Sequence, residues 1–271
     1  MIKNLNITDM KRLLILICVV LGSMHFAGAS FAKDVNEVKP VALKNAYKSL
    51  FRITTYTVDG KKIGEGTGFF VSATGEGIAP YSLFKGAASA ELTDYKGKPL
   101  SVYRILGASE LYDMVKFSTQ GGKKIQPMPF VQSSELKAES AVNLVRYTTN
   151  KKNLPVLTKI ASADDFDSYK YYTLSIENDT VNVACPVLTE AGFVAAFTQF
   201  NVGGDSLGVC AIDVRFAKDF SINSTSAFNS DLTAIKIPKA LPEKEEDAET
   251  FVYMASRMDS VTAHTALNDF L

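Results

Sequence analysis

Imidazole, the side chain that most often serves as a catalytic base, is scarce in this sequence. The 271 residues include two histidines, His25 and His264, and three cysteines, Cys18, Cys185 and Cys210. A serine hydroxyl needs a neighbouring base to become a nucleophile, and zinc needs several imidazole or thiolate ligands. Histidine-based mechanisms therefore have almost no candidates, and no metal site is expected.

The overall composition excludes further classes of protein. Lys and Arg total 29 against 29 Asp and Glu, so the chain shows no basic excess of the kind that nucleic-acid-binding proteins carry. With 46% hydrophobic and 21% charged residues, the sequence has the composition of a globular protein. It contains no EF-hand, Walker or G-x-G-x-x-G motif in the setting that a cofactor site requires, so we expect no cofactor.

The N-terminus has the pattern of a secretory signal peptide. Lys11 and Arg12 precede the apolar run 13–21, and small residues follow as far as Ala29 and Ala32. A retained membrane anchor is the alternative, but a span needs about 20 apolar residues. We therefore expect a signal peptide over residues 1–32, cleaved near Ala32, and a secreted or periplasmic protein.

Cleavage would remove Cys18 and His25 and leave two cysteines and one histidine. In an oxidising compartment Cys185 and Cys210 could form a disulfide. Alternatively, they are two buried thiols that pack as small hydrophobic side chains. The sequence leaves both alternatives open.

From residue 43 to about residue 220 the chain is predicted to form short strands divided by turns. Alternating, β-branched or apolar runs occur at residues 49–58, 66–72, 77–84, 90–95, 100–106, 114–117, 141–147, 157–161, 171–176, 186–188, 193–200 and 208–214. Asp59-Gly60 is a typical hairpin turn. The spacing favours an antiparallel sandwich or barrels, with no long amphipathic helix in this region.

The C-terminal stretch is different and is predicted to form a helical hairpin over residues 241–271. Its first helix, 241–257, starts with proline and acidic residues, and the second begins at Asp259 or Ser260. The apolar face of the hairpin either packs on its own domain or binds a partner or a second copy of the chain.

The motifs in the barrel or sandwich region occur in an order that resembles the trypsin-like serine peptidases, in particular their bacterial HtrA-like branch. The matching segments are Gly66–Val71, the turn at Thr74-Gly75, Gly77–Ala87, Tyr112–Phe117, Val181–Val187 and Gly208–Asp219. The resemblance covers residues 43–220 and implies two six-stranded antiparallel β-barrels. With the helical tail predicted above, the expected fold is all-β, two trypsin-like barrels with a C-terminal α-helical hairpin. The implied domains are barrels at 33–130 and 131–222, a linker at 223–240 and the tail at 241–271.

The same resemblance places the catalytic positions of that family on residues that cannot perform its chemistry. Ser82 stands where the family has its histidine base, Asp113 keeps the orienting acid, and Val183 replaces the nucleophilic serine. Valine has no oxygen to attack with, and a serine hydroxyl cannot act as a base near neutral pH. Val181 and Val183 stand at the positions that correspond to the oxyanion hole. The β-branched Val181 replaces a glycine of the family, and Ala184 and Cys185 replace two further glycines.

The remaining chemistry-bearing residues do not rebuild a triad. His264 lies in the predicted tail, and no imidazole or cation adjoins Cys185 in the sequence to activate its thiol. Without a histidine to orient, Asp113 is expected to accept hydrogen bonds from backbone N–H groups or from Ser82.

We therefore predict that the protein is an inactive serine peptidase homologue that binds a protein or peptide. By the resemblance, Thr198, Gln199 and Phe200 form the strand edge that would pair with a peptide. Two alternatives stay open. One is a hydrolase with an unorthodox site, and the other is an envelope structural component that oligomerises through 241–271.

Overall fold

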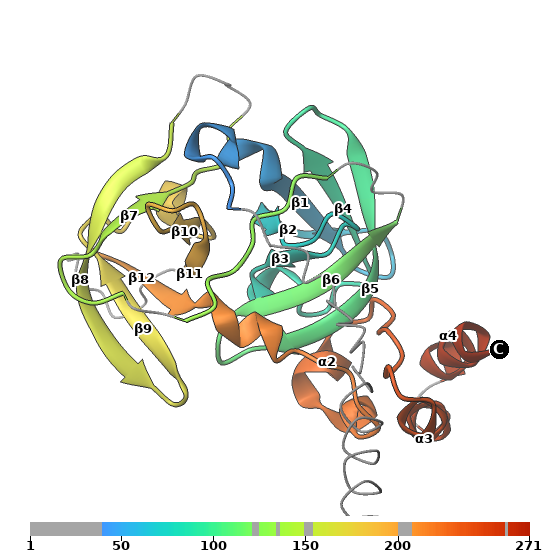
Figure 1. Cartoon of the computed structure of the whole chain (residues 1–271). Coiled ribbons are helices and arrows are strands. Elements are labelled where there is room, and N and C mark those ends of the chain that lie inside the picture. The colour runs from blue at the N-terminus through green and yellow to red at the C-terminus, as the bar shows by residue number, and fades with distance from the viewer. Residues whose placement is uncertain (1–39, 121–124, 134–135, 149–153, 200–207, 258–259) are drawn as a thin grey trace, which may run out of the picture. The chain divides into compact units, whose positions relative to one another are not determined.

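The computed structural model describes residues 40–271 except 121–124, 134–135, 149–153, 200–207 and 258–259. In this part of the chain, twelve strands form two closed antiparallel barrels of six strands each (Figure 1). The predicted fold of two six-stranded barrels is confirmed. The predicted signal peptide, residues 1–32, lies outside the described residues.

The first barrel contains the strands that the alternating pattern of residues 49–117 predicts. Around the barrel the order is β1 (Leu50–Tyr56), β2 (Lys62–Phe70), β3 (Gly77–Ala79), β6 (Met114–Gln120), β5 (Pro99–Ser109) and β4 (Ser89–Asp94). The hairpin between β1 and β2 turns at Gly60, whose φ of 76° is readily adopted only without a Cβ.

The second barrel repeats the strand order of the first. It runs β7 (Ala141–Leu144), β8 (Val156–Phe166), β9 (Tyr169–Leu174), β12 (Val209–Asp213), β11 (Val194–Gln199) and β10 (Pro186–Leu188). Counted from its own first strand, each barrel has the order 1-2-3-6-5-4. The two halves are therefore topological copies.

The strand predicted at residues 77–84 is wrong beyond Ala79. Pro80 follows with φ −61° and has no N–H to donate to the sheet, so the chain leaves the barrel and forms the 3₁₀ segment η2 (Tyr81–Leu83). This departure presents Ser82 outside the sheet, where its side chain is exposed.

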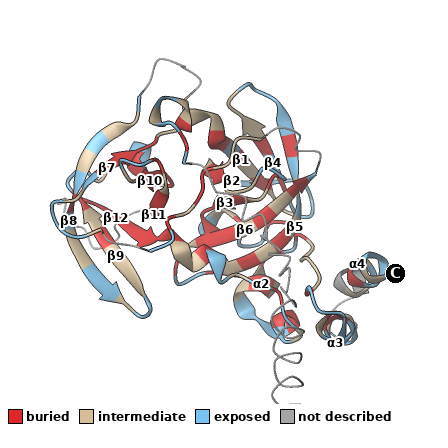
Figure 2. Ribbon diagram, viewed as in Figure 1, coloured by how far each residue is buried: buried red, intermediate tan, exposed pale blue. Residues whose placement is uncertain are grey.

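The interior of the molecule has three clusters of buried apolar residues. One fills the first barrel, one fills the second, and the third joins strands of both barrels, with Phe69 of β2 and Phe197 of β11 at ring centroids 5.6 Å apart. Figure 2 shows the buried residues concentrated on the inward parts of both barrels, whereas the hairpin of β8 and β9 is mostly exposed or half-buried.

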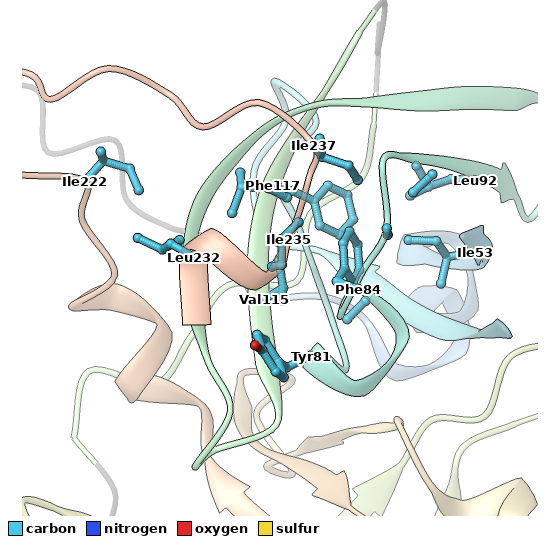
Figure 3. Packing of buried hydrophobic residues seen from close by; sticks show 14 of the residues in the cluster. Ile53, Tyr81, Phe84, Leu92, Val115, Phe117, Ile222, Leu232, Ile235 and Ile237 are labelled. Carbon is cyan, nitrogen blue, oxygen red and sulfur yellow. The ribbon is translucent and has the colours of Figure 1, made fainter. Parts of the chain in front are cut away.

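The segment 223–240, expected as a linker, packs against the first barrel. It contains the 3₁₀ segment η5 (Ser226–Phe228) and the short helix α2 (Ser230–Ala234), which the sequence did not predict. Figure 3 shows Ile235 and Ile237 beside Phe117 in the cluster of the first barrel. The backbone of Ile105 also bonds to that of Pro238 and Ala240.

The tail forms the two helices that the sequence predicts, α3 (Glu245–Ala255) and α4 (Ser260–Phe270), which lie side by side. The first helix begins three residues beyond the predicted proline start, because Lys244 is still extended at φ −87° and ψ 131°. Phe251, Ala255 and Ala266 are buried in the cluster of the first barrel. Within the described residues, none of the helices combines the length and the apolar character that crossing a bilayer requires.

Candidate functional site

The structure brings together two of the three residues at the expected catalytic positions. The backbone N–H of Ser82, in η2, donates to Oδ1 of Asp113 at 2.7 Å, and Oγ of Ser82 lies 3.4 Å from Oδ2. The expectation that Asp113 accepts hydrogen bonds from Ser82 is confirmed. Both oxygens of the carboxylate face a serine that has no basic nitrogen, so this pair cannot activate a nucleophile.

The loop that carries Asp113 is fixed by its neighbours. Asp113 is half-buried with φ 43°, a left-handed conformation that aspartate tolerates better than most residues, and its N–H donates to Glu110 O. The N–H of Glu110 in turn donates to the carboxylate of Asp231 in α2. The segment after the second barrel therefore supports the loop of the first.

The loop at the expected nucleophile position forms the 3₁₀ segment η3 (Thr180–Asn182). The N–H of Val183 donates to Thr180 O at 3.2 Å, and the N–H of Val181 donates to Oδ1 of Asp179 at 3.4 Å. Both N–H groups that would correspond to oxyanion donors are thus bonded within the loop. An oxyanion hole needs such donors aimed at the substrate oxygen, so this loop does not supply one.

Asn182 anchors this loop to the second barrel. Its Oδ1 accepts from Nε and Nη2 of Arg146 at 2.8 and 2.6 Å, and its Nδ2 donates to Glu177 O at 2.7 Å. The side chain is 2% exposed and its polar atoms are all paired, which makes the loop conformation costly to change.

The two cysteines are free thiols in the structure, so the disulfide alternative is not realised. Cys185 is 2% exposed, and burial raises the pKa of its thiol to about 12, although the nearby Arg146 acts in the opposite direction. A thiol with this pKa is neutral near pH 7 and is a poor nucleophile.

The strand edge expected to pair with a peptide is occupied at Thr198. This residue is 1% exposed; its N–H donates to Cys185 O at 3.0 Å, and its carbonyl accepts from Ala184 at 2.9 Å. The expectation of a free edge at Thr198 is therefore wrong, because β11 lies between chain segments on both sides. Gln199 donates from Nε2 to Tyr112 O, and Phe200 lies outside the described residues.

His264 does not approach a triad arrangement. It lies exposed on α4, and Nδ2 of Asn268 donates to its Nδ1 at 3.0 Å, one helical turn away. Within the described part of the chain, no group of three or more potential ligands could hold a metal ion.

An open pocket of about 420 Å³ lies beside η3 and is lined from both barrels. Its walls include Arg52 of β1 and Thr67 of β2, with Arg146, Tyr147 and η3 on the other side. The sequence did not predict a site at these residues, because a charged position on a strand usually indicates a solvated face. The basic and aromatic pair Arg146-Tyr147, at the end of a predicted strand, was the available signal.

Comparison with protein-family models finds no match, and no curated protein matches the sequence of this chain. The class that the structure defines is therefore architectural. It is a pair of six-stranded antiparallel barrels with the same strand order. An acid lies beside a serine in the first barrel, and a closed loop borders a pocket that residues of both barrels line.

Proposed function

We propose that the chain is an exported, catalytically inactive relative of the trypsin-like serine peptidases, whose double barrel serves as a scaffold for binding a protein or peptide. The repeated strand order and the pairing of Ser82 with Asp113 support the relationship. One observation carries the inactivity. At the expected nucleophile Val183 there is no side-chain oxygen, and its N–H is committed to Thr180 O.

The alternative of an active hydrolase would need another nucleophile. Cys185 is the nearest thiol to Val183, but it is buried and its pKa is raised to about 12. Ser82 is exposed, yet its side chain faces a carboxylate rather than an imidazole. Neither group has the activation that nucleophilic catalysis requires.

The alternative of an oligomerisation component would need the apolar face of the tail to be free. Instead, the buried residues Phe251, Ala255 and Ala266 pack into the cluster of the first barrel. The tail is therefore an integral part of its own fold, and this favours the binding scaffold over assembly through residues 241–271.

Catalytic inactivity is tested by incubating the protein without residues 1–32 with a fluorophosphonate probe and a fluorogenic peptide library. We expect neither covalent labelling nor cleavage. Labelling at any serine would overturn the inactive assignment, and cleavage that persists after repurification would do the same.

Binding is tested separately by selecting random peptides displayed on phage against the same immobilised protein. We expect enriched peptides that bind the folded protein saturably in fluorescence anisotropy and do not bind the urea-unfolded chain. A selection that enriches no peptide able to bind saturably would refute the scaffold function.

A further inference from the structure

The pocket beside η3 concentrates positive charge where the two barrels meet. Arg52 comes from β1 and Arg146 from the residues just after β7, and both line the same pocket. The guanidinium carbon of Arg52 lies 5.8 Å from the ring centroid of Tyr147, which also lines it. The pocket thus joins two guanidinium groups with an aromatic wall.

Neither arginine is neutralised by an ion pair among the described residues. The partner of Arg146 is the neutral Oδ1 of Asn182, which receives two of its five N–H groups, and the hydrogen bonds found between described residues use none of the other three. In contrast, Arg104 and Arg215 each bind an aspartate at 2.6 Å. Arg52 and Arg146 therefore differ from these paired arginines in having donors to offer to a ligand.

The acidic groups near the pocket leave it with a net positive charge. Asp179 lies at the edge, since its carboxylate accepts from Thr180 and Val181, two lining residues. Glu65 faces Arg52 more weakly, and it is already paired with Lys62 at 2.6 Å. The Lys62–Glu65 pair is neutral as a whole, so the pocket has two positive charges from the arginines and one negative charge from Asp179. This balance favours a ligand group that carries a single negative charge.

We propose that this pocket binds a carboxylate of the peptide partner, an aspartate or glutamate side chain held between Arg52 and Arg146. The inference rests on the proposed scaffold function and names the chemistry that its ligand must carry. Guanidinium forks bind carboxylates through paired, charge-assisted hydrogen bonds, and the half-buried position of Arg146 strengthens such contacts relative to open water. A phosphate dianion fits less well, because Asp179 repels its second charge.

Arginine side-chain NMR provides a direct test. The chain has five arginines beyond residue 32, which give five Nε–Hε signals: Arg52, Arg104, Arg146, Arg215 and Arg257. The protein is titrated with N-acetyl-L-glutamate methylamide up to about 50 mM, a concentration that nearly saturates a site with a millimolar Kd. We expect saturable shifts of Arg52 and Arg146, while the ion-paired Arg104 and Arg215 stay in place.

Matched ligands and variants separate a built site from general charge attraction. The uncharged N-acetyl-L-glutamine methylamide should cause no shift. Arg52→Gln, an exposed position that the fold tolerates, should weaken glutamate binding about tenfold or more, the effect of one lost charge-assisted contact. Lys98→Gln removes an equal charge at an exposed turn outside the pocket and should leave the affinity unchanged.

Four results would overturn the carboxylate pocket: equal shifts with the glutamine analogue, parallel shifts of all five arginines, no shift at the highest concentration, or binding of inorganic phosphate without binding of the glutamate analogue. The failure of this inference is distinct from failure of the scaffold function. Selected peptides could bind the Arg52→Gln variant as tightly as the wild type, and bind as tightly when their acidic side chains are changed to amides. Those two results would support the scaffold function and refute the carboxylate pocket.

Discussion

At the scale of single residues, Asp113 has a structural role that can be measured. Asp113→Asn keeps the side-chain shape and a residue type that tolerates the observed φ of 43°, but it removes the charge that receives two hydrogen bonds from Ser82. We expect the free energy of unfolding to fall by about 1–2 kcal/mol, the usual loss for a charge-assisted hydrogen bond. Urea titration followed by far-UV circular dichroism measures it.

Asp167 provides the control for this substitution, because it is exposed and has a similar φ of 54°. Asp167→Asn should change the unfolding free energy by less than about 0.5 kcal/mol. Equal effects of the two substitutions would mean that the contacts of Asp113 with Ser82 contribute no stability.

The thiol of Cys185 should be inert in the folded protein. With a pKa of about 12, only about one thiol in 10⁴ is ionised at pH 8, and the side chain is 2% exposed. We expect the folded protein without residues 1–32 to react with Ellman's reagent more than ~100-fold more slowly than the urea-unfolded chain, which should show two thiols. Rapid reaction of one folded thiol, lost in Cys185→Ala, would contradict the assignment.

The raised pKa of Cys185 also fixes the sign of a pH effect on stability. The pKa of the folded state lies above the 9.0 of a free thiol, so ionisation favours the unfolded chain. The contribution of the Cys185 thiol to the free energy of unfolding is therefore fully present below pH 9 and is lost as the pH rises toward 12. The difference in stability between the wild type and Cys185→Ala isolates the contribution of this thiol from those of other groups.

At the scale of elements, the segment η3 explains why a histidine and a serine introduced at the expected catalytic positions should not create activity. The double variant Ser82→His/Val183→Ser gains an imidazole and a hydroxyl at those positions, but the N–H of residue 183 remains bonded to Thr180 O and that of Val181 to Asp179. Loss of a single oxyanion donor costs about 2.7–4 kcal/mol in the barrier. We expect no labelling by a fluorophosphonate probe and no peptide cleavage.

An active trypsin-like serine peptidase should be labelled in parallel to validate the probe. The double variant must also keep the far-UV spectrum of the wild type, so that inactivity is not due to unfolding. Labelling of the hydroxyl introduced by Val183→Ser would show that the loop opens to supply its N–H groups, contrary to the closed geometry seen in η3.

The tail helix α4 is held by a partly buried ion pair. Nε and Nη2 of Arg104 donate to the two carboxylate oxygens of Asp269 at 2.6 and 2.7 Å, and the guanidinium stacks on Tyr103 at 3.8 Å. The pair with Asp269 raises the pKa of Arg104. We expect Asp269→Asn to speed hydrogen exchange in α4 by about 5–30-fold, which corresponds to roughly 1–2 kcal/mol of local stability.

The ion pair of Lys85 and Glu110 provides the contrast, since both side chains are more than half exposed, at 58% and 55%. Glu110→Gln should leave the exchange of α4 unchanged, and exposed pairs of this kind contribute about 0–1 kcal/mol. If Asp269→Asn had no effect on α4 either, apolar packing alone would hold the tail.

Local patterns predicted the elements better than they predicted the contacts between them. Alternating side chains and turn glycines are local signals, so twelve strands could be predicted, and the error at residues 80–84 arose where Pro80 ended the sheet. The role of residues 223–240 could not be predicted, because Ile235 and Ile237 gain their partners only when the first barrel is formed.

The candidate site was predictable in part for the same reason. Ser82 and Asp113 could be paired from the order of the motifs. The closure of the loop at Val183 depends on backbone hydrogen bonds, which carry no residue-type signature. The pocket of Arg52 and Arg146 joins residues 94 positions apart, and only the meeting of the barrels brings them together.

At the scale of the whole molecule, the cluster shared by the barrels should make them unfold as one unit. It draws Leu50, Phe69 and Ile78 from the first barrel and Val194 and Phe197 from the second, all 0–1% exposed. A bond from Thr67 Oγ1 to Ala184 O at 3.1 Å adds a polar link. A barrel that unfolded alone would expose the apolar face of the other.

Phe197→Ala tests this coupling. Removing a buried phenylalanine typically costs about 3–5 kcal/mol. If the barrels are coupled, the slowest-exchanging amides of β6 in the first barrel should lose protection by the same amount as those of β12 in the second, as measured by hydrogen exchange and mass spectrometry. The control Phe228→Ala, at a ring that is 53% exposed, should change both by less than about 0.5 kcal/mol. Loss of protection confined to the second barrel would show that the two barrels are independent units, and the pocket between Arg52 and Arg146 would then open whenever either barrel unfolds.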